Sequence, residues 1–308
     1  MTGGQHGARV WTALWIVYLV WGSTYLAIKW ADESLPPFPM LSVRFLLAGT
    51  LLFAWCARKG LPRPTGRQWR DAAIVGTLLA SCGNGGVGWA ETRIDSGLAA
   101  LIVAIIPLWI ALLDRVFLGG RLTGRGWVGI AIGLAGVAVL VDPSGSSRRQ
   151  LAAAVVVLLG SFAWAVGSIY ATRSERTDDP LLGISMQMLA GGTVLAVMGV
   201  GQWSRVDLGA VTGKSWLGLL YLVLVGSVLA YSAYGWLLHA APPSLVATYA
   251  YVNPVVAVLL GTLIDDEALT ARTLAGGAVI VVAVMLIITA RPARVAAERR
   301  LEPARRAA

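Results

Sequence analysis

Ten apolar segments separated by short polar turns leave this chain few ways to fold. A helix needs roughly 20 apolar residues to cross the ~30 Å hydrocarbon core of a bilayer, and backbone amides in lipid are satisfied only within helices or closed barrels. Hydrophobic residues make up 57% of the chain and charged residues 13%, which excludes a soluble globular class. We predict an all-α membrane protein with ten transmembrane helices. These cover about residues 11–28, 39–57, 72–90, 96–117, 126–141, 151–171, 181–202, 215–238, 244–264 and 273–290.

A weak internal repeat divides the chain into two halves. Moving the numbering by 147 places Pro254 on Pro107, and a Leu-Thr-x-Arg turn follows each of these segments. A shift of 143 relates the preceding segments and places Trp164 on Trp21. Because each half holds an odd number of spans, the second half is inverted relative to the first, a pattern typical of secondary transporters. We predict two inverted five-helix repeats at 1–141 and 151–290, a connecting loop at 142–150 and a basic cytoplasmic tail at 291–308.

The net charge of +9 is distributed in the way expected of a membrane protein. If the N-terminus is cytoplasmic, most of the 25 lysines and arginines fall in cytoplasmic turns and in the C-terminal tail. This asymmetry follows the positive-inside rule. Both termini are therefore predicted to be cytoplasmic, the basic tail is predicted to face lipid headgroups, and no nucleic-acid partner is expected.

Residues 249–261 read YAYVNPVVAVLLG and place an asparagine and a proline together inside an apolar helix. Because lipid offers an amide no partner, Asn253 is expected to face protein or a water-filled cavity. Pro254 removes one helical N–H and favours a kink. Pro254 and its counterpart Pro107 are hinge candidates, with prolines tolerated in a tightly packed bundle as the alternative.

Two charged residues lie within or beside apolar segments. Arg44 is expected to face the interior and to pair with a carboxylate, a carbonyl or an anionic substrate. Its alternative is to snorkel to the nearer interface. Glu91, at the end of the third segment, is a candidate for binding a proton or a cationic group, and the alternative is an ordinary interfacial carboxylate close to Arg93.

The chain has 13 tryptophans, many of which are expected to anchor the helices at the membrane interfaces. Others lie deeper, where aromatic rings and hydroxyl groups would form a cavity suited to an amphiphilic organic solute. Packing is the alternative for any single ring. The substrate path is predicted to be lined or bordered by Trp21, Thr24, Asn84, Trp89, Glu91, Trp109, Trp164, Tyr249 and Asn253.

Apparent motifs for catalysis or nucleotide binding do not fit their context. GNGGVG at 83–88 matches a dinucleotide fingerprint but lies inside an apolar segment rather than after a strand. GAVTGKS at 209–215 is one residue too short for a phosphate-binding loop. Cys56 and Cys82 lack metal-binding spacing. The sequence predicts no catalytic, cofactor-binding or metal-binding residues, and no enzyme.

Four stretches carry a resemblance to a known family. They are WGSTYLAIK at 21–29, RFLLAG at 44–49, SGLAALIVAIIP at 96–107 and YVNPVVAVLLGTLIDDE at 251–267. Together they resemble the EamA family of the drug/metabolite transporter superfamily, over about residues 11–290. The resemblance implies ten helices in two inverted repeats, alternating access to a central cavity, and export of amino acids, metabolites or drugs from bacterial inner membranes. The family's acidic residue after the fourth span of each repeat is Glu267 in the second half but Gly120 in the first, so no role that requires the pair is expected.

We interpret the chain as an inner-membrane secondary transporter that exports small organic solutes, with protons as a candidate coupling partner. A membrane enzyme acting on lipid-linked substrates is one alternative, and it predicts an acidic or nucleophilic cluster at one interface. A non-transporting receptor or scaffold is the other, and a fused signalling domain would favour it.

Overall fold

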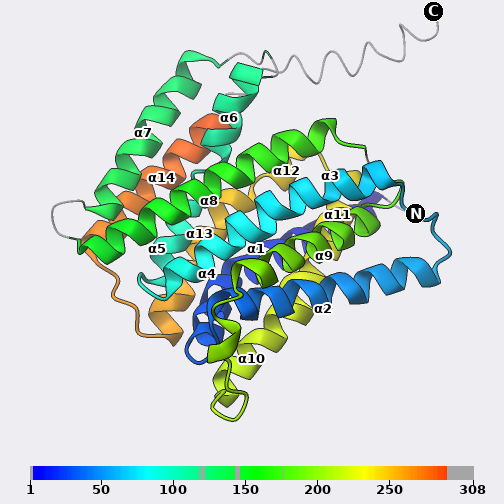
Figure 1. Ribbon diagram of the computed structural model, residues 1–308. Coiled ribbons are helices and arrows are strands. Elements are labelled where there is room, and N and C mark those ends of the chain that lie inside the picture. Colours follow the sequence, from blue (N-terminus) through cyan, green and yellow to red (C-terminus); the bar gives the residue numbers. More distant parts are fainter. Residues whose placement is uncertain (1–2, 118, 120–121, 143–145, 176, 290–308) are drawn as a thin grey trace, which may run out of the picture.

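The computed structural model describes residues 3–117, 119, 122–142, 146–175 and 177–289, and no strand is present among them (Figure 1). Gly120, the middle of the connecting loop and the basic tail at 291–308 lie outside the described residues. The helices of the first half are α1 (Gly3–Asp32), α2 (Pro37–Arg58), α3 (Gly66–Gly76), α4 (Gly85–Glu91), α5 (Ser96–Val103), α6 (Ile106–Phe117) and α7 (Gly124–Val141). Those of the second half are α8 (Arg148–Arg173), α9 (Pro180–Met198), α10 (Gly213–Tyr221), α11 (Ala230–Ala240), α12 (Pro243–Val246), α13 (Tyr249–Ile264) and α14 (Ala271–Thr289).

Within the described residues, eight helical segments are long and apolar enough to cross a membrane, and α13 is a shorter apolar helix. Two helical rods contain π-helical segments, and one of them, Gly213–Leu237, is among the eight. Thr77–Asn84 joins α3 to α4, and Leu222–Leu229 joins α10 to α11. The expectation of an all-helical membrane protein is thus confirmed.

The first helix is longer than its apolar segment. It was expected to end near residue 28, but α1 continues to Asp32 and includes Lys29. The reason is that the Lys29 ammonium ion finds two carboxylates there, Asp265 and Glu267, so the charge does not end the helix.

Small residues allow the helices to approach closely. A Cβ added to Gly76 of α3 would collide with the Gln187 carbonyl oxygen of α9, and one added to Gly136 of α7 would lie 3.3 Å from the Gly276 carbonyl oxygen of α14. Because lipid tails are as apolar as the helix surfaces, there is no hydrophobic driving force for helices to associate in a bilayer. Van der Waals packing at glycines stabilises the helix contacts instead. Helix α2 packs against α9, α7 against α14, and α1 against α13.

The two candidate hinge prolines occupy different positions. Turn residues Ala104 and Ile105 separate α5 from α6, so Pro107 lies in the first turn of α6 and not in mid-helix as expected. The first turn tolerates proline because its N–H has no intrahelical partner. Pro254 does lie inside α13, where it is buried.

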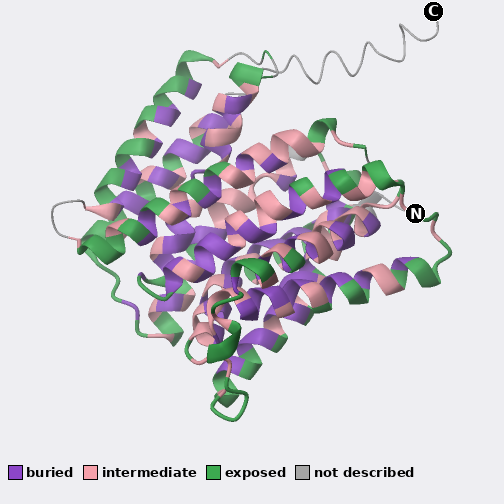
Figure 2. Cartoon of the chain, viewed as in Figure 1, coloured by how far each residue is buried: buried purple, intermediate pink, exposed green. Residues whose placement is uncertain are grey.

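Most helices carry buried residues on one side and exposed residues on another (Figure 2). Exposed apolar side chains include Leu47, Leu51 and Trp55 of α2. Such broad apolar exposure fits a surface that faces acyl chains. We call the two ends of the bundle the Glu267 end, with residues 33–36, 92–95 and 265–270, and the Asp71 end, with residues 59–65 and 174–175.

Candidate functional site

An aromatic cluster lies where α1, α11 and α13 meet. The Trp21 ring lies 5.0 Å from the Tyr231 ring, 5.0 Å from the Tyr234 ring and 5.2 Å from the Tyr249 ring, centroid to centroid. Tyr234 and Tyr249 are themselves 6.0 Å apart, edge to face. These rings present flat apolar faces and phenol hydroxyls together, as a site for an amphiphilic solute requires.

Asn253 and Thr24 border this cluster on α13 and α1. Both are largely buried. With its amide nitrogen turned toward the neighbouring acceptors, Asn253 donates to the carbonyl oxygens of Tyr18 and Tyr249, each at 3.2 Å. Gly22 allows α1 and α13 to approach this closely, because a Cβ added there would lie 2.6 Å from the Val256 Cβ and 3.0 Å from the Asn253 carbonyl oxygen. The Asn253 amide therefore faces protein, as expected, and joins α1 to α13.

Arg44 of α2 points into the bundle and does not reach an interface. Its residue is 2% exposed, and its Nε donates to the Ser227 hydroxyl at 3.0 Å. Its guanidinium lies 4.8 Å from the Phe45 ring. Its Nη1 is buried and has no hydrogen-bond partner among the described residues. The snorkelling alternative is wrong, and one donor of a buried charge is left available, which is costly unless a ligand or water meets it.

Two carboxylates complete the polar interior. Glu91, at the end of α4, is 5% exposed, and both its oxygens are buried without a hydrogen-bond partner in the described part of the chain. The same holds for both oxygens of Asp32, at the end of α1. A Cβ on Gly88, one turn before Glu91, would lie 3.7 Å from Asp32 Oδ2. Sequence reasoning missed Asp32 because it ended the first span before it, and the acidic residue at a helix end gave no separate signal.

A second charged group lies beyond these carboxylates, at the Glu267 end. Lys29 Nζ lies 2.7 Å from Glu267 Oε1 and 2.9 Å from Asp265 Oδ2. The same Glu267 carboxylate accepts from the backbone amides of Ser96 at 2.8 Å and Gly97 at 3.0 Å, and so caps α5. Burial alone would raise the pKa of Glu267, but the hydrogen bonds from Lys29 and the α5 amides outweigh it and hold the pKa below its usual value.

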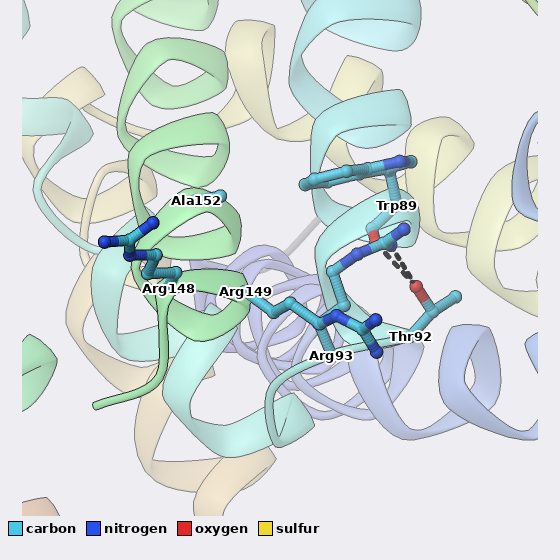
Figure 3. Close-up of a pocket in the computed structure, with 6 residues that line it drawn as sticks. All are labelled: Trp89, Thr92, Arg93, Arg148, Arg149 and Ala152. Carbon is cyan, nitrogen blue, oxygen red and sulfur yellow. Dashed lines mark hydrogen bonds between the residues drawn. The ribbon is translucent and has the colours of Figure 1, made fainter. Parts of the chain in front are cut away.

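The remaining predicted path residues lie away from the Trp21 cluster. Asn84 donates to the Leu79 carbonyl oxygen within its own rod. The Trp164 ring packs against Gly83, where a Cβ would lie 2.8 Å from it. Trp109 donates to the Ser161 hydroxyl at 3.0 Å, between α6 and α8. Trp89 lines a hollow at the Glu267 end (Figure 3). Trp21, Thr24, Tyr249 and Asn253 are therefore the predicted residues that the fold brings together.

Comparison with known proteins places this architecture in a family. A model described as the EamA-like transporter family matches residues 10–142 and again 151–289. "Uncharacterized inner membrane transporter YedA" of Escherichia coli K12 is 40% identical over 277 residues, 89% of each chain. A "Probable terminal-alkyne amino-acid exporter" of Streptantibioticus cattleyicolor is 26% identical over 284 residues, 90% of this chain and 92% of that one. A crystal structure with 20% identity shares the fold, with a TM-score of 0.63 over 92% of this chain and 98% of the other. The chain therefore belongs to the EamA-like transporter family.

Proposed function

We propose that this protein is a secondary transporter that exports small organic solutes, such as amino acids, metabolites or drugs, across the bacterial inner membrane by alternating access. The observation that carries the proposal is the buried polar interior. Arg44, Glu91 and Asp32 hold buried polar atoms that have no hydrogen-bond partner among the described residues. Ionisable groups are costly there and mark solute or ion pathways. The Trp21 cluster adds the apolar surface that an organic solute needs.

An inverted two-repeat layout, with ten spans, underlies this mechanism in our proposal. The double match of the family model supports it, because each match covers one half of the chain. Helix packing supports it as well. Helix α1 contacts α13 and the rod of α10, while α8 contacts α6 and the rod of α3 and α4. In the proposed repeat, α8 corresponds to α1, α6 to α13, and the rod of α3 and α4 to the rod of α10. The contacts of α8 in one half therefore correspond to those of α1 in the other. With both termini cytoplasmic, the Asp71 end faces the cytoplasm and the Glu267 end faces outward.

Pro107 and Pro254 act as hinges in this proposal, one at the start of a helix and the other inside one. At Pro107 the rod is already interrupted by Ala104 and Ile105, so α6 can tilt against α5 with little loss of helical hydrogen bonding. Pro254 removes one bond inside a continuous α13, beside Asn253. Replacing Pro254 with Ala is expected to slow the exchange between states more than replacing Pro107, as measured by counterflow rates. Unchanged kinetics for both variants would contradict the hinge assignment.

Glu91 and Asp32 are the proposed proton-binding groups. A buried carboxylate without a hydrogen-bond partner is a group that can take up a proton, and a proton can be exchanged for solute during the transport cycle. Glu91→Gln fixes the neutral form. It is expected to abolish the dependence of transport on a pH gradient while leaving counterflow, which needs no gradient, in place. Transport by Glu91→Gln that still follows the gradient would remove Glu91 from this role.

Counterflow of labelled amino acids and metabolites into liposomes tests the function directly. We expect saturable counterflow for at least one solute, and a large loss with Tyr249→Ala and Asn253→Ala. Trp203→Ala is the matched control, because Trp203 lies in the short helix Trp203–Arg205, away from the aromatic cluster. Equal losses in all three variants would mean that the cluster is not the solute site. A folded protein without counterflow for any solute would overturn the transporter proposal for that solute panel.

A further inference from the structure

A hollow of about 490 Å³ opens between the end of α4 and the start of α8, at the Glu267 end (Figure 3). Its lining residues are Trp89, Thr92, Arg93, Arg148, Arg149 and Ala152. Arg93 is held in place, since its guanidinium lies 3.7 Å from the centroid of the Trp89 ring and its Nη1 donates to the Trp89 carbonyl oxygen at 2.6 Å. Arg149 extends from α8 toward Arg93, while the Arg148 side chain leaves α8 on the other side of the hollow (Figure 3). Three arginines therefore line one hollow, with two of their guanidinium groups on the same side of α8.

These arginines have no carboxylate partner among the described residues, unlike other cations at the same end. Lys29, Lys214 and Arg272 each pair with an aspartate or glutamate. Arg148 and Arg149 instead occupy the first turn of α8, which contains no acidic residue. Cations are unfavourable at the positive end of a helix dipole, so this first turn holds positive charge that only an external anion can neutralise. Guanidinium groups match the geometry of phosphate oxygens.

Below the hollow, α8 presents an apolar stripe on the same face. Ala152, which lines the hollow, is followed at helical spacing by Val155, Leu159 and Phe162, exposed by 51%, 63% and 40%. Exposed side chains of this kind contact acyl chains in a bilayer. Positive charge at the headgroup level above an apolar stripe matches a phospholipid, whereas a free phosphate ion would use the arginines alone.

We propose that this hollow binds the headgroup of an anionic phospholipid, with Arg93 and Arg149 at the phosphate, Arg148 adding positive charge beside it, and an acyl chain along the Ala152–Phe162 stripe. Basic pockets between transmembrane helices are suited to anionic headgroups. None of the residues of the Trp21 cluster lines this hollow, so lipid binding here can be measured independently of the proposed transport function.

Native mass spectrometry of the detergent-purified full chain, titrated with phosphatidylglycerol, tests this site. We expect tighter binding of phosphatidylglycerol than of phosphatidylcholine. In Arg148→Gln/Arg149→Gln the affinity for phosphatidylglycerol is expected to fall about 25-fold, from roughly five-fold for each charge. The matched control is Arg63→Gln/Arg67→Gln, which removes two exposed arginines at the opposite end and should leave this binding unchanged.

A second variant separates a lipid from a free anion. Val155→Asn/Leu159→Asn keeps the arginines and makes the stripe polar, so it should weaken phosphatidylglycerol binding and leave inorganic phosphate binding as it was. The proposal is overturned if the double arginine variant binds phosphatidylglycerol like the wild type. It is also overturned if phosphatidylcholine binds equally well, or if inorganic phosphate displaces the lipid and the stripe variant has no effect.

Discussion

At the Glu267 end, the Glu267 carboxylate accepts hydrogen bonds from Lys29 and from two backbone amides of α5. The neighbouring Asp265 carboxylate pairs with Lys29 and Lys214 and accepts a hydrogen bond from the Trp30 indole N–H at 3.0 Å. At the Asp71 end, the Asp71 carboxylate accepts from the Tyr170 hydroxyl at 2.9 Å and from the Glu175 amide at 2.8 Å. The first group joins α1, α5, α10 and the turn after α13, whereas the second joins α3 to the end of α8. Under the proposed alternating access, we expect from this difference that the Glu267 end is the harder of the two ends to open.

The largest effect is expected from Glu267→Ala. It removes the cap of α5 and the charge-assisted hydrogen bond from Lys29, a loss of about 2 kcal/mol for the closed state. Ser96 is fully buried beneath this carboxylate, so Ser96→Cys can report opening. In a background without Cys56 and Cys82, labelling of that cysteine by an external, membrane-impermeant maleimide should rise about 30-fold. Unchanged labelling would mean that Glu267 does not hold this end closed.

Acidification should produce a smaller effect through the same carboxylate. Because the pKa of folded Glu267 lies below its ordinary value of 4.5, ionised Glu267 contributes stability above that value and loses it as the pH falls through the folded pKa. Near neutral pH the wild type should melt at a higher temperature than Glu267→Gln. This difference in melting temperature should disappear as the pH falls below 4.5. A difference that stays constant with pH would show that the ionised form is not what stabilises this end.

Asp71→Asn is expected to loosen the Asp71 end, but by less than Glu267→Ala loosens the other end. It removes the charge that Arg70 meets at 2.8 Å and weakens the acceptor of Tyr170, while packing between α3 and α9 at Gly76 remains. Labelling of Ala72→Cys in inside-out vesicles measures the change. If labelling of Ala72→Cys rises as much as labelling of Ser96→Cys does in Glu267→Ala, the two carboxylates stabilise their ends equally. The proposed difference between the two ends would then be wrong.

Glu33→Gln should have the smallest effect. Its ion pair with Lys214 lies at the surface, with both side chains about 40% exposed. Such pairs contribute about 0.5 kcal/mol or less, and Lys214 keeps Asp265 as a partner. Maleimide labelling of the Ser96→Cys reporter should therefore change less than two-fold. A large increase would show that the closed end depends on its peripheral charges rather than on the capped α5.

The helical architecture and part of the polar interior could be predicted because both depend on local properties. Apolar length sets a membrane-spanning helix, and a polar side chain inside such a helix has to face protein. On this ground Arg44 and Asn253 were expected in the interior, and both are buried in the structure. It also grouped Trp21 with Tyr249, which the structure places in ring contact.

The contacts that close the Glu267 end could not be predicted, because they depend on residues far apart in the chain. Lys29 and Glu267 are 238 positions apart, and hydropathy treats each as the edge of a segment. Likewise, an aromatic count does not say which face of a helix a ring occupies. Trp109 therefore contacts Ser161 on α8 instead of the Trp21 cluster. Pro107 was expected in mid-helix because the turn before it, Ala104–Ile105, is as apolar as the helices on either side.

The two π-helical segments set the angular phase of the residues that follow them. A single residue accounts for about 100° around a helix axis, so one extra residue within a turn rotates everything beyond it by that angle. Glu91 follows Thr77–Asn84, and Tyr231 and Tyr234 follow Leu222–Leu229. Removing one residue from Thr77–Asn84 would turn Glu91 from the interior toward the side of the rod. A deletion of one residue in either segment is therefore expected to present different side chains to the proposed solute path, even though every later residue is unchanged.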